Sequence, residues 1–234
     1  MIALVPAKST SQRIKNKNLQ KIGGRTLLEN AITLAKKSQL FDAVYVSTDS
    51  DVYATHAIEA GARVPFMRPK GLAEPRSTDY DWCFDTMRLL WEDGVKPDVI
   101  AIIRCTTPFV TVDSLIEGFS LLDAFSHSVR AVKRADTHPG KMWTIHHGYL
   151  QPLWSLYTEE KPWHSAQTQY LPPVYYNAGS FEFLWLDTLW DTKSIAGSVI
   201  KPYVLEYPEN MDINTPYDIA VAKAMLDLAK VSLP

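Results

Sequence analysis

The chain has 234 residues, 46% of them hydrophobic and 21% charged, and a formal net charge of −2, the composition of a soluble globular protein that does not coat nucleic acid. Its two cysteines, Cys83 and Cys105, provide neither a disulfide framework nor a paired metal-ligand spacing, which suits a reducing cytoplasm. No apolar run approaches the roughly 18 residues of a membrane helix, and Met1–Val5 is too short for a signal-peptide core, so we expect a cytoplasmic protein without nucleic-acid or membrane partners.

The first part of the chain alternates short apolar runs with amphipathic stretches. Ile2–Val5 predicts a buried strand, followed by a polar loop and then a helix that begins after Thr26 in a capping-box pattern. Ala43–Val46 predicts a second strand, and 51–60 predicts a second helix that stops at Gly61.

The later elements continue this alternation. A third helix is predicted over 79–91, and a continuous apolar strand over 98–103 is typical of a strand that is buried on both faces. Another helix is expected over 112–125, and a closing strand over 200–205. The last helix is expected over 215–229, with a threonine N-cap and a proline at its first position.

This alternation of strands and helices predicts an α/β fold in a single domain over 1–234, with a doubly wound, mostly parallel sheet. Ligands of such sheets bind at the carboxyl ends of the strands, where the loops over 6–18, 47–50 and 104–111 would converge. The pattern changes over 128–176, which is rich in Trp, His, Tyr and Pro and shows no convincing helix. We interpret this segment as an insertion that covers the site or pairs subunits, because aromatic residues are enriched at interfaces.

The first loop concentrates positive charge. Six basic side chains and no acid occur from Lys8 to Arg25, and the first acid is Glu29. A solvated charged loop is the usual explanation of such a run. The alternative is a loop that holds a polyanion such as a triphosphate, since small residues over 7–11 let backbone N–H groups approach phosphate oxygens while lysines neutralise the charge. The loop is neither a Walker loop nor a dinucleotide-binding loop, because both glycine patterns are absent.

The opening stretch "IALVPAKSTSQRIKNKN" resembles the signature of the cytidylyltransferases that activate sialic acid and related nonulosonic or ulosonic acids: a strand, then Ala-Arg-x-x-Ser-Lys, then Lys-Asn. Four further stretches follow in the family's order: "VYVSTDS", "FMRPKGLAEPRST", "TTPFVT" and "MDINTPYDIAVAKAML". The resemblance spans nearly the whole chain and implies a Rossmann-like nucleotidyltransferase fold. It also implies transfer of CMP from CTP to a sialic-acid-like nonulosonic acid with release of pyrophosphate, Mg²⁺ as the cofactor, and a homodimer.

The resemblance assigns roles to residues by position. Lys8 and Lys17 would neutralise the triphosphate and would be catalytic together with Asp212. Asp212 and Asn214 would hold the metal. The implied nucleotide contacts are Ala7, Lys8, Ser11, Lys17, Asn18, Arg68, Ser77 and Thr106. The implied acceptor contacts, the first two of them candidates for its carboxylate, are Arg104, Lys141 and Gln169.

Several positions depart from the family pattern. Asn214 stands where the second metal aspartate belongs, which removes one negative charge. Gln12 occupies the place of a lysine, although Arg13 beside it can partly compensate. The other departures replace a glutamine by Arg104, arginines by Val110 and Thr168, and an asparagine by Ala178. The acceptor therefore stays open, as do two alternatives: a same-fold nucleotidyltransferase for another nucleotide or sugar, and a catalytically silent nucleotide- or sugar-binding paralogue.

Some of these residues also have a purely structural explanation. Asp212 could be a turn acid before the helix that begins after Thr215, and Lys141 could lie on an ordinary strand edge. His146 and His147 would point to opposite faces of a strand, which favours surface or partner contact over metal binding. An NAD-dependent oxidoreductase is disfavoured by the missing glycine fingerprint.

Overall fold

The computed structural model describes residues 1–154, 157–158, 161–228 and 230–234. The chain forms two compact units, the first made of 1–131 and 178–234, and the second of 132–177. The composition of the chain predicts an insertion that begins at 128, whereas the boundary between the two units lies at 132. The physical reason is that Val129 and Ala131 are fully buried in the core of the first unit.

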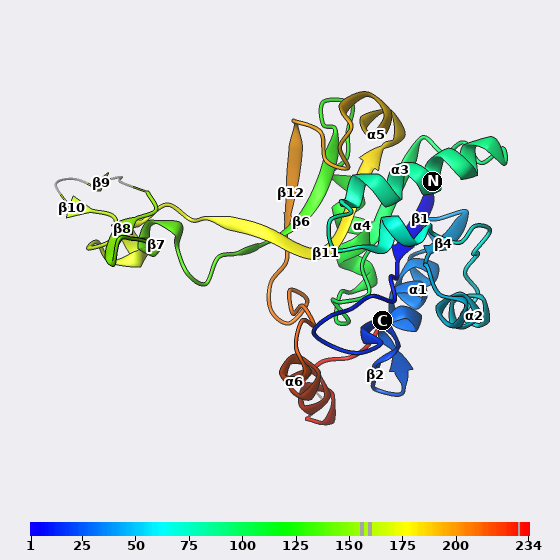
Figure 1. Ribbon diagram of the computed structural model, residues 1–234, viewed down its shortest axis with the longest axis horizontal. Coiled ribbons are helices and arrows are strands. Elements are labelled where there is room, and N and C mark those ends of the chain that lie inside the picture. The colour runs from blue at the N-terminus through cyan, green and yellow to red at the C-terminus, as the bar shows by residue number, and fades with distance from the viewer. Residues whose placement is uncertain (155–156, 159–160, 229) are drawn as a thin grey trace. The chain divides into compact units, whose positions relative to one another are not determined.

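A six-stranded sheet runs through the first unit (Figure 1). Its strands, in spatial order, are β12 (Ile200–Val204), β6 (Ser128–Arg134), β11 (Tyr175–Trp185), β5 (Val99–Ile103), β1 (Ile2–Pro6) and β4 (Ala43–Ser47). β1 pairs in parallel with β4 on one side and with β5 on the other. β11 is antiparallel to β5. The predicted doubly wound, mostly parallel sheet is confirmed.

Helices cover both faces of this sheet. They are α1 (Leu27–Ser38), α2 (Asp51–Glu59), α3 (Asp79–Glu92), α4 (Val112–Ser120), α5 (Leu186–Thr192) and α6 (Pro216–Asp227). Ala3 and Val5 of β1 belong to a core shared with α1, α4 and α6, whereas Ile2 and Leu4 belong to a core shared with α3 and α5. Because the side chains of a strand alternate between its two faces, each face of β1 has its own core. None of the described helices combines the length and the apolar character that a bilayer crossing demands.

The helix ends follow the signals in the sequence. The Thr26 side chain accepts a hydrogen bond from Glu29 N, and the Glu29 carboxylate accepts one from Thr26 N, so the predicted capping box of α1 is confirmed. Thr215 caps α6 in the same way, with a proline at the first helical position. α2 stops before Gly61, whose φ of 87° lies in the left-handed region. The end of α6 expected at Ala229 lies outside the described residues.

α4 is shorter than expected and ends at Ser120 instead of residue 125. The residues that follow form a local turn, in which the Ser126 hydroxyl lies 3.0 Å from Asp123 Oδ1 and 3.1 Å from the Asp123 carbonyl. Short polar side chains that bond to nearby backbone compete with helix continuation. This turn therefore overrides the helical pattern beyond Ser120.

The order of the strands positions the site. From β1 the chain continues through α1 to β4 on one side, whereas β5 lies on the other side of β1 and its chain continues through α4 to β6. A crevice forms where neighbouring parallel strands lead away in opposite directions, at their carboxyl ends. The loop after β1 contains the 3-10 turn η1 (Lys17–Leu19) and a small hairpin of β2 (Lys21–Ile22) and β3 (Arg25–Thr26).

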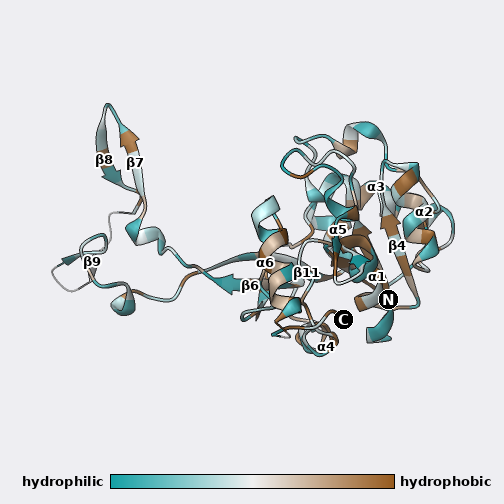
Figure 2. Cartoon of the chain, turned by 90° about the horizontal axis from the view of Figure 1, so that it is seen from below, coloured by the Kyte–Doolittle hydropathy of each residue, from teal (hydrophilic) through white to brown (hydrophobic). Residues whose placement is uncertain are grey.

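The second unit consists of short strands and turns. β7 (Trp143–His146) and β8 (Tyr149–Pro152) form an antiparallel hairpin, β9 (Tyr157–Thr158) pairs with β10 (Lys161–Pro162), and two 3-10 turns are η3 (Pro139–Lys141) and η4 (Thr168–Tyr170). Every residue of β7 is exposed, and hydrophobic and hydrophilic residues are mixed along the hairpin (Figure 2). His147 lies in the hairpin turn with φ of 48°, and its ring centroid is 4.4 Å from that of His146. The expected placement of these two side chains on opposite faces of a strand is wrong, because His147 follows the end of β7.

Candidate active site

A cavity of about 480 Å³ opens at the carboxyl ends of β1 and β5. Three segments line it: the loop after β1, the segment that leads into α3, which includes the 3-10 turn η2 (Lys70–Ala73), and the first residues after β5. The predicted site residues among its lining are Lys8, Ser11, Lys17, Asn18, Arg68, Ser77, Arg104 and Thr106. Gln12 and Arg13 line it as well. Side chains that lie far apart in the sequence are thus brought together where the fold predicts a ligand site.

The basic loop is fixed to its neighbours by short hydrogen bonds. The Ser9 backbone N–H and the Ser9 hydroxyl each donate to one oxygen of Asp49, at 2.7 Å in both cases. The Thr10 hydroxyl donates to the Ala73 carbonyl at 2.6 Å. Asn18 is buried, and its amide lies 3.4 Å from the Lys8 carbonyl. The loop is therefore held at several points, which pre-organises its backbone and cations for an anionic ligand.

Lys17 lies at the other end of this loop, in η1. Its ammonium donates to the Ile213 carbonyl at 2.7 Å. Burial lowers the pKa of Lys17; the negative charge of Asp212 opposes this shift, and the positive charge of Arg13 adds to it. The ammonium is thus partly desolvated and lies among other charged groups, which strengthens its interaction with an incoming anion.

Arg68 also lines the cavity. It is buried, its Nε lies 3.0 Å from Ser47 Oγ, and its Nη2 lies 2.9 Å from the Ser47 carbonyl. The guanidinium lies over the Trp82 ring at 4.9 Å from the centroid, a cation–π contact. Burial lowers the pKa of Arg68 to about 10, against the opposing charges of Asp49 and Asp79. Arg68 is therefore charged at neutral pH but held rigidly by the protein.

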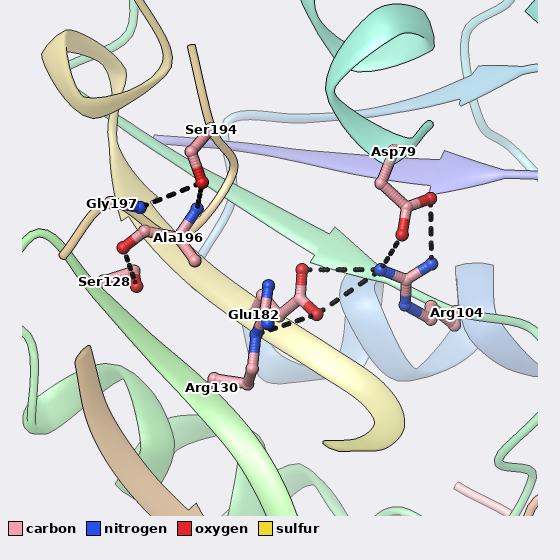
Figure 3. Close-up of polar contacts among 8 residues, drawn as sticks. All are labelled: Asp79, Arg104, Ser128, Arg130, Glu182, Ser194, Ala196 and Gly197. Carbon is pink, nitrogen blue, oxygen red and sulfur yellow. Dashed lines mark hydrogen bonds and ion pairs between the residues drawn. The ribbon is translucent and has the colours of Figure 1, made fainter. Parts of the chain in front are cut away.

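Arg104 is paired with two carboxylates (Figure 3). Its Nη2 lies 2.8 Å from Asp79 Oδ2 and 3.4 Å from Glu182 Oε1, and its Nη1 lies 3.2 Å from Asp79 Oδ1. Burial would lower the pKa of Arg104, but the charges of Glu182 and Asp79 outweigh it and raise the pKa above its ordinary value. Burial likewise would raise the pKa of Asp79, but Arg104 and a hydrogen bond from Trp82 lower it. These charges support one another in a partly buried cluster.

Asp212 and Asn214 are in direct contact, the Asn214 amide donating to Asp212 Oδ2. The side-chain oxygen of Asn214 accepts a hydrogen bond from Arg13 Nη2 at 2.7 Å. The donor set fits a magnesium ion held by one protein carboxylate, Asp212, because Mg²⁺ is commonly bound through one or two carboxylates, substrate phosphates and water. Asn214 fits less well as a ligand, since both ends of its amide are engaged. The described residues contain no group of three or more His, Cys, Asp or Glu side chains arranged to hold a metal.

Three predicted contacts lie elsewhere. Ala7 is fully buried under the loop and does not line the cavity. Lys141 and Gln169 belong to the second unit. The Lys141 ammonium donates to the backbone carbonyls of His164, at 3.1 Å, and Ala166, and the Gln169 amide donates to the side chain of Gln167 at 3.0 Å. Their roles in acceptor binding remain predictions.

Two of the departures from the family pattern concern the core. Val110 and Ala178 are both buried among hydrophobic residues of the first unit. An arginine at position 110 or an asparagine at position 178 would need polar partners there. Gln12, in contrast, faces the cavity and adds an uncharged amide beside the cations of the first loop.

Sequence reasoning missed Asp49, Asp79 and Trp82. Asp79 and Trp82 line the cavity, with the Trp82 indole donating to Asp79 Oδ1 at 2.9 Å. Asp49 follows β4 within the stretch "VYVSTDS", so its place after a strand was a usable signal. Asp79 gave no comparable signal, because an acid in the first turn of a helix is ordinary.

The comparisons with known proteins agree with this geometry. A family model described as "Cytidylyltransferase" matches residues 2–114. The CMP-N,N'-diacetyllegionaminic acid synthase of Legionella pneumophila is 26% identical and covers 100% of this chain and 99% of its own. The pseudaminic acid cytidylyltransferase of Campylobacter jejuni serotype O:2 is 24% identical and covers 96% of this chain and 95% of its own.

The fold matches solved structures. The structure of CMP:2-keto-3-deoxy-manno-octonic acid synthetase complexed with CTP aligns with a TM-score of 0.69 at 12% identity, over 97% of this chain and 98% of that chain. At this identity the likeness shows the fold alone. It agrees with the matching family model, the full-length relatives and the cationic cavity after β1. The chain matches the cytidylyltransferase family model over residues 2–114 and is similar to CMP-sugar-acid synthases and cytidylyltransferases over nearly its full length.

Proposed function

We propose that the protein transfers CMP from CTP to a hydroxyl group of a sialic-acid-like nonulosonic acid and releases pyrophosphate. The observation that carries this proposal is the cavity at the end of the sheet, which is lined by Lys8, Arg13 and Lys17 of one loop and by Arg68. The relatives named for legionaminic and pseudaminic acid support the acceptor class. A same-fold enzyme for another nucleotide would need different contacts to the base and is not favoured by these relatives.

The reaction is a displacement at the α-phosphorus. The acceptor oxygen forms a bond to this phosphorus while the bond to the oxygen bridging toward the β-phosphate breaks, the hydroxyl releases its proton, and pyrophosphate leaves with the electron pair. The part of the protein is positioning and charge stabilisation. Lys8 and Lys17 would neutralise the phosphates, and Arg13 is close enough to Lys17 for their charges to interact.

We also propose Mg²⁺ as the cofactor. Asp212 would hold it, and when bound the ion would neutralise phosphate charge and orient the triphosphate. Lys17 and Asp212 are electrostatically coupled, so the loop after β1 and the segment before α6 would act on the same phosphates.

Two further proposals concern the whole protein. We propose a homodimer formed through the second unit, on the basis of its exposed aromatic and aliphatic side chains. We place the reaction in the cytoplasm, on the basis of two buried cysteines that are both free thiols.

The test is a pyrophosphate-release assay with each of the four nucleoside triphosphates against a panel of nonulosonic and ulosonic acids. CTP with a nonulosonic acid should give turnover, and CTP with Mg²⁺ should raise the Tm more than ATP, GTP or UTP, because a ligand that binds only the folded state stabilises it. Equal shifts with all four nucleotides would leave a triphosphate site without base selection. Absence of turnover with every acceptor, despite CTP binding, would favour the silent paralogue.

A further inference from the structure

Protein carboxylates neutralise the positive charge of the Arg104 guanidinium. Nη1 and Nη2 face the two oxygens of Asp79 side by side, at 3.2 Å and 2.8 Å. Nη2 also lies 3.4 Å from both oxygens of Glu182 (Figure 3). Glu182 is 1% exposed and lies in turn 3.3 Å from Arg130 Nε. Two arginines and two carboxylates therefore form one cluster whose formal charges cancel.

The hydrogen-bonding capacity of Arg104 is not exhausted by these partners. A guanidinium has five N–H donors. In the part of the chain that the structure describes, the side-chain partners of Arg104 are Asp79 and Glu182, and neither bonds to Nε. Arg104 lines the cavity with its side chain 19% exposed. Its Nε–H and the second hydrogen of Nη1 have no bonding partner among the described residues, so they are available as donors.

The cavity-lining cations of the loop after β1, unlike Arg104, are not paired with carboxylates of the described residues. Arg13 bonds to the uncharged amide of Asn214, and Lys17 bonds to a backbone carbonyl. No carboxylate lies within ion-pair distance of Lys8 or Arg13 among the described residues. Anionic groups of a substrate are accordingly drawn to the loop after β1, whereas Arg104 offers directed N–H groups with little net charge.

We infer that Arg104 is a specificity residue that donates hydrogen bonds to an uncharged oxygen of the substrate, a hydroxyl or carbonyl, and that Asp79 and Glu182 are the positioning residues that neutralise and orient it. The oxygen belongs either to CTP or to the acceptor. The inference rests on the proposed function, and it replaces the expectation that Arg104 binds the acceptor carboxylate. Asp79 has a second positioning contact, the indole of Trp82, whose ring packs against the Arg68 guanidinium.

The first test compares Arg104→Gln with Arg104→Met. Both remove the charge, but only glutamine keeps N–H donors. Both leave Glu182 paired with Arg130 and Asp79 partly exposed, so the Tm of the two variants should be similar. We expect kcat/KM of Arg104→Gln within about threefold of the wild type and that of Arg104→Met lower by about tenfold or more, as for loss of a hydrogen bond in a site built to make it.

The KM values identify the substrate that Arg104 contacts. A rise in KM for CTP places the bonded oxygen on the nucleotide, and a rise for the sugar acid places it on the acceptor. Equal losses in both variants would show that the charge is what matters and would overturn the inference. Wild-type activity in Arg104→Met would overturn it as well, because no substrate oxygen would then depend on this side chain.

The second test removes the neutralising charge. Asp79→Asn leaves Arg104 with one carboxylate, so inorganic phosphate should inhibit about threefold more strongly than in the wild type, because a net positive charge is exposed in the cavity. Asp85→Asn is the matched control: it makes the same change on the same helix, at an aspartate paired with Arg88 at 3.2 Å and absent from the cavity lining. Unchanged inhibition by phosphate in Asp79→Asn would show that Asp79 does not mask Arg104.

The failure of the inference is distinguishable from that of the proposed function. If the wild type shows no turnover with CTP and any sugar acid, the proposed function fails, and phosphate binding to Asp79→Asn and Asp85→Asn, measured by calorimetry, still tests the neutralisation of Arg104. If the wild type turns over and the glutamine and methionine variants behave alike, only the inference fails.

Discussion

Lys17 keeps a positive charge in a place where burial disfavours it. The ammonium is fixed by the Ile213 carbonyl and interacts with the charge of Asp212. If this charge stabilises the phosphates in the transition state, Lys17→Ala should lower kcat on the order of 10²-fold with the fold intact, as for loss of one stabilising group. Steady-state kinetics together with a Tm measurement test this. Replacing a solvated surface lysine should leave kcat almost unchanged. Lys15→Ala in the same loop is the control, because the Lys15 side chain is exposed and does not line the cavity.

The pH dependence follows from the direction of the Lys17 pKa. Because burial lowers this pKa, raising the pH removes the charge sooner than from an ordinary lysine, whose pKa is about 10.4. In a plot of kcat/KM for CTP against pH, the decline at alkaline pH should therefore occur at a lower pH than the pKa of an ordinary lysine. An arginine at position 17 stays charged at alkaline pH. The decline of kcat/KM should therefore move to higher pH in Lys17→Arg, even if the maximum rate of this variant is lower. A decline at the same pH in the two enzymes would exclude Lys17 as the group that titrates.

Asp212 should carry the metal requirement almost alone. Asp212→Ala should abolish Mg²⁺-dependent turnover, since no second carboxylate replaces it at position 214. Asn214→Asp should be tolerated and should lower the Mg²⁺ concentration needed for half-maximal activity, because it adds an anionic ligand. The shift should be moderate, since an aspartate at 214 would also pair with Arg13. Activity measured against Mg²⁺ concentration tests both variants. If Asp212→Ala is active with an unaltered Mg²⁺ concentration for half-maximal activity, Asp212 does not bind the metal and has only a structural role in the turn before α6.

The residues that sequence reasoning found are those whose chemistry is local to one motif. Lys8, Lys17 and Asn18 lie within a single stretch, so a motif is enough to assign them to the cavity. The pairing of Arg104 with Asp79 could not be read in this way, because the two residues are 25 positions apart and neither one indicates the other as its partner. Charge neutralisation in a pocket depends on tertiary packing, which a linear pattern does not contain.

At the scale of elements, the loop after β1 owes its position to Asp49. Asp49→Ala removes the acceptor of two hydrogen bonds from Ser9, so the loop should lose its fixed geometry and kcat/KM for CTP should fall by about tenfold. Asp49→Asn keeps one carbonyl oxygen for the Ser9 N–H and should recover most of this loss. Hydrogen exchange of the loop amides should rise in the alanine variant in parallel.

The control for Asp49 is Asp51→Ala, two residues along. Asp51 is exposed in the first turn of α2, and its side chain makes no hydrogen bond to the loop among the described residues. Activity within about twofold of the wild type is expected there. If Asp49→Ala keeps full activity while its loop exchanges faster, the order of the loop is not needed for catalysis.

The elements that could be predicted are those with cap signals and a clear period. The helices that begin after Thr26 and Thr215 are given by capping boxes that are visible in the sequence. β6 resembles part of the insertion in sequence because it ends in two charged residues, Lys133 and Arg134, although Val129 is fully buried. β11 is hard to recognise as a strand of 11 residues because its exposed first residues and buried last ones differ in pattern. A strand that leaves the core changes its periodicity along its length, and a fixed period cannot describe it.

At the scale of the whole molecule, the second unit leaves apolar surface uncovered. Ile145 is 77% and Leu150 61% exposed, and the two are cross-strand partners in the β7–β8 hairpin. A two-stranded hairpin is marginally stable without further packing. We therefore expect the wild type to be a dimer at micromolar concentration by sedimentation velocity. Ile145→Lys combined with Leu150→Glu keeps a favourable cross-strand pair but removes the apolar surface, and should yield a monomer.

The control for the dimer is Ile58→Lys, which changes a residue that is 58% exposed on α2 of the first unit. This variant should sediment like the wild type. A monomeric wild type at micromolar concentration would contradict the predicted dimer. If the double variant is still a dimer, the interface does not include the β7–β8 hairpin.

The pairing of β5 has a consequence for how the chain folds as it is synthesised. Ile102 lies opposite Leu4 on one side and opposite Glu182 on the other. The β1 side of β5 can form once both strands have left the ribosome, but its other edge stays open until β11 has emerged. That edge belongs to the sequence Val-Ile-Ala-Ile-Ile, an apolar, strand-forming segment of the kind that pairs with other chains when exposed. The whole second unit must be translated during this interval, so the nascent chain has its greatest tendency to aggregate while the second unit is being made.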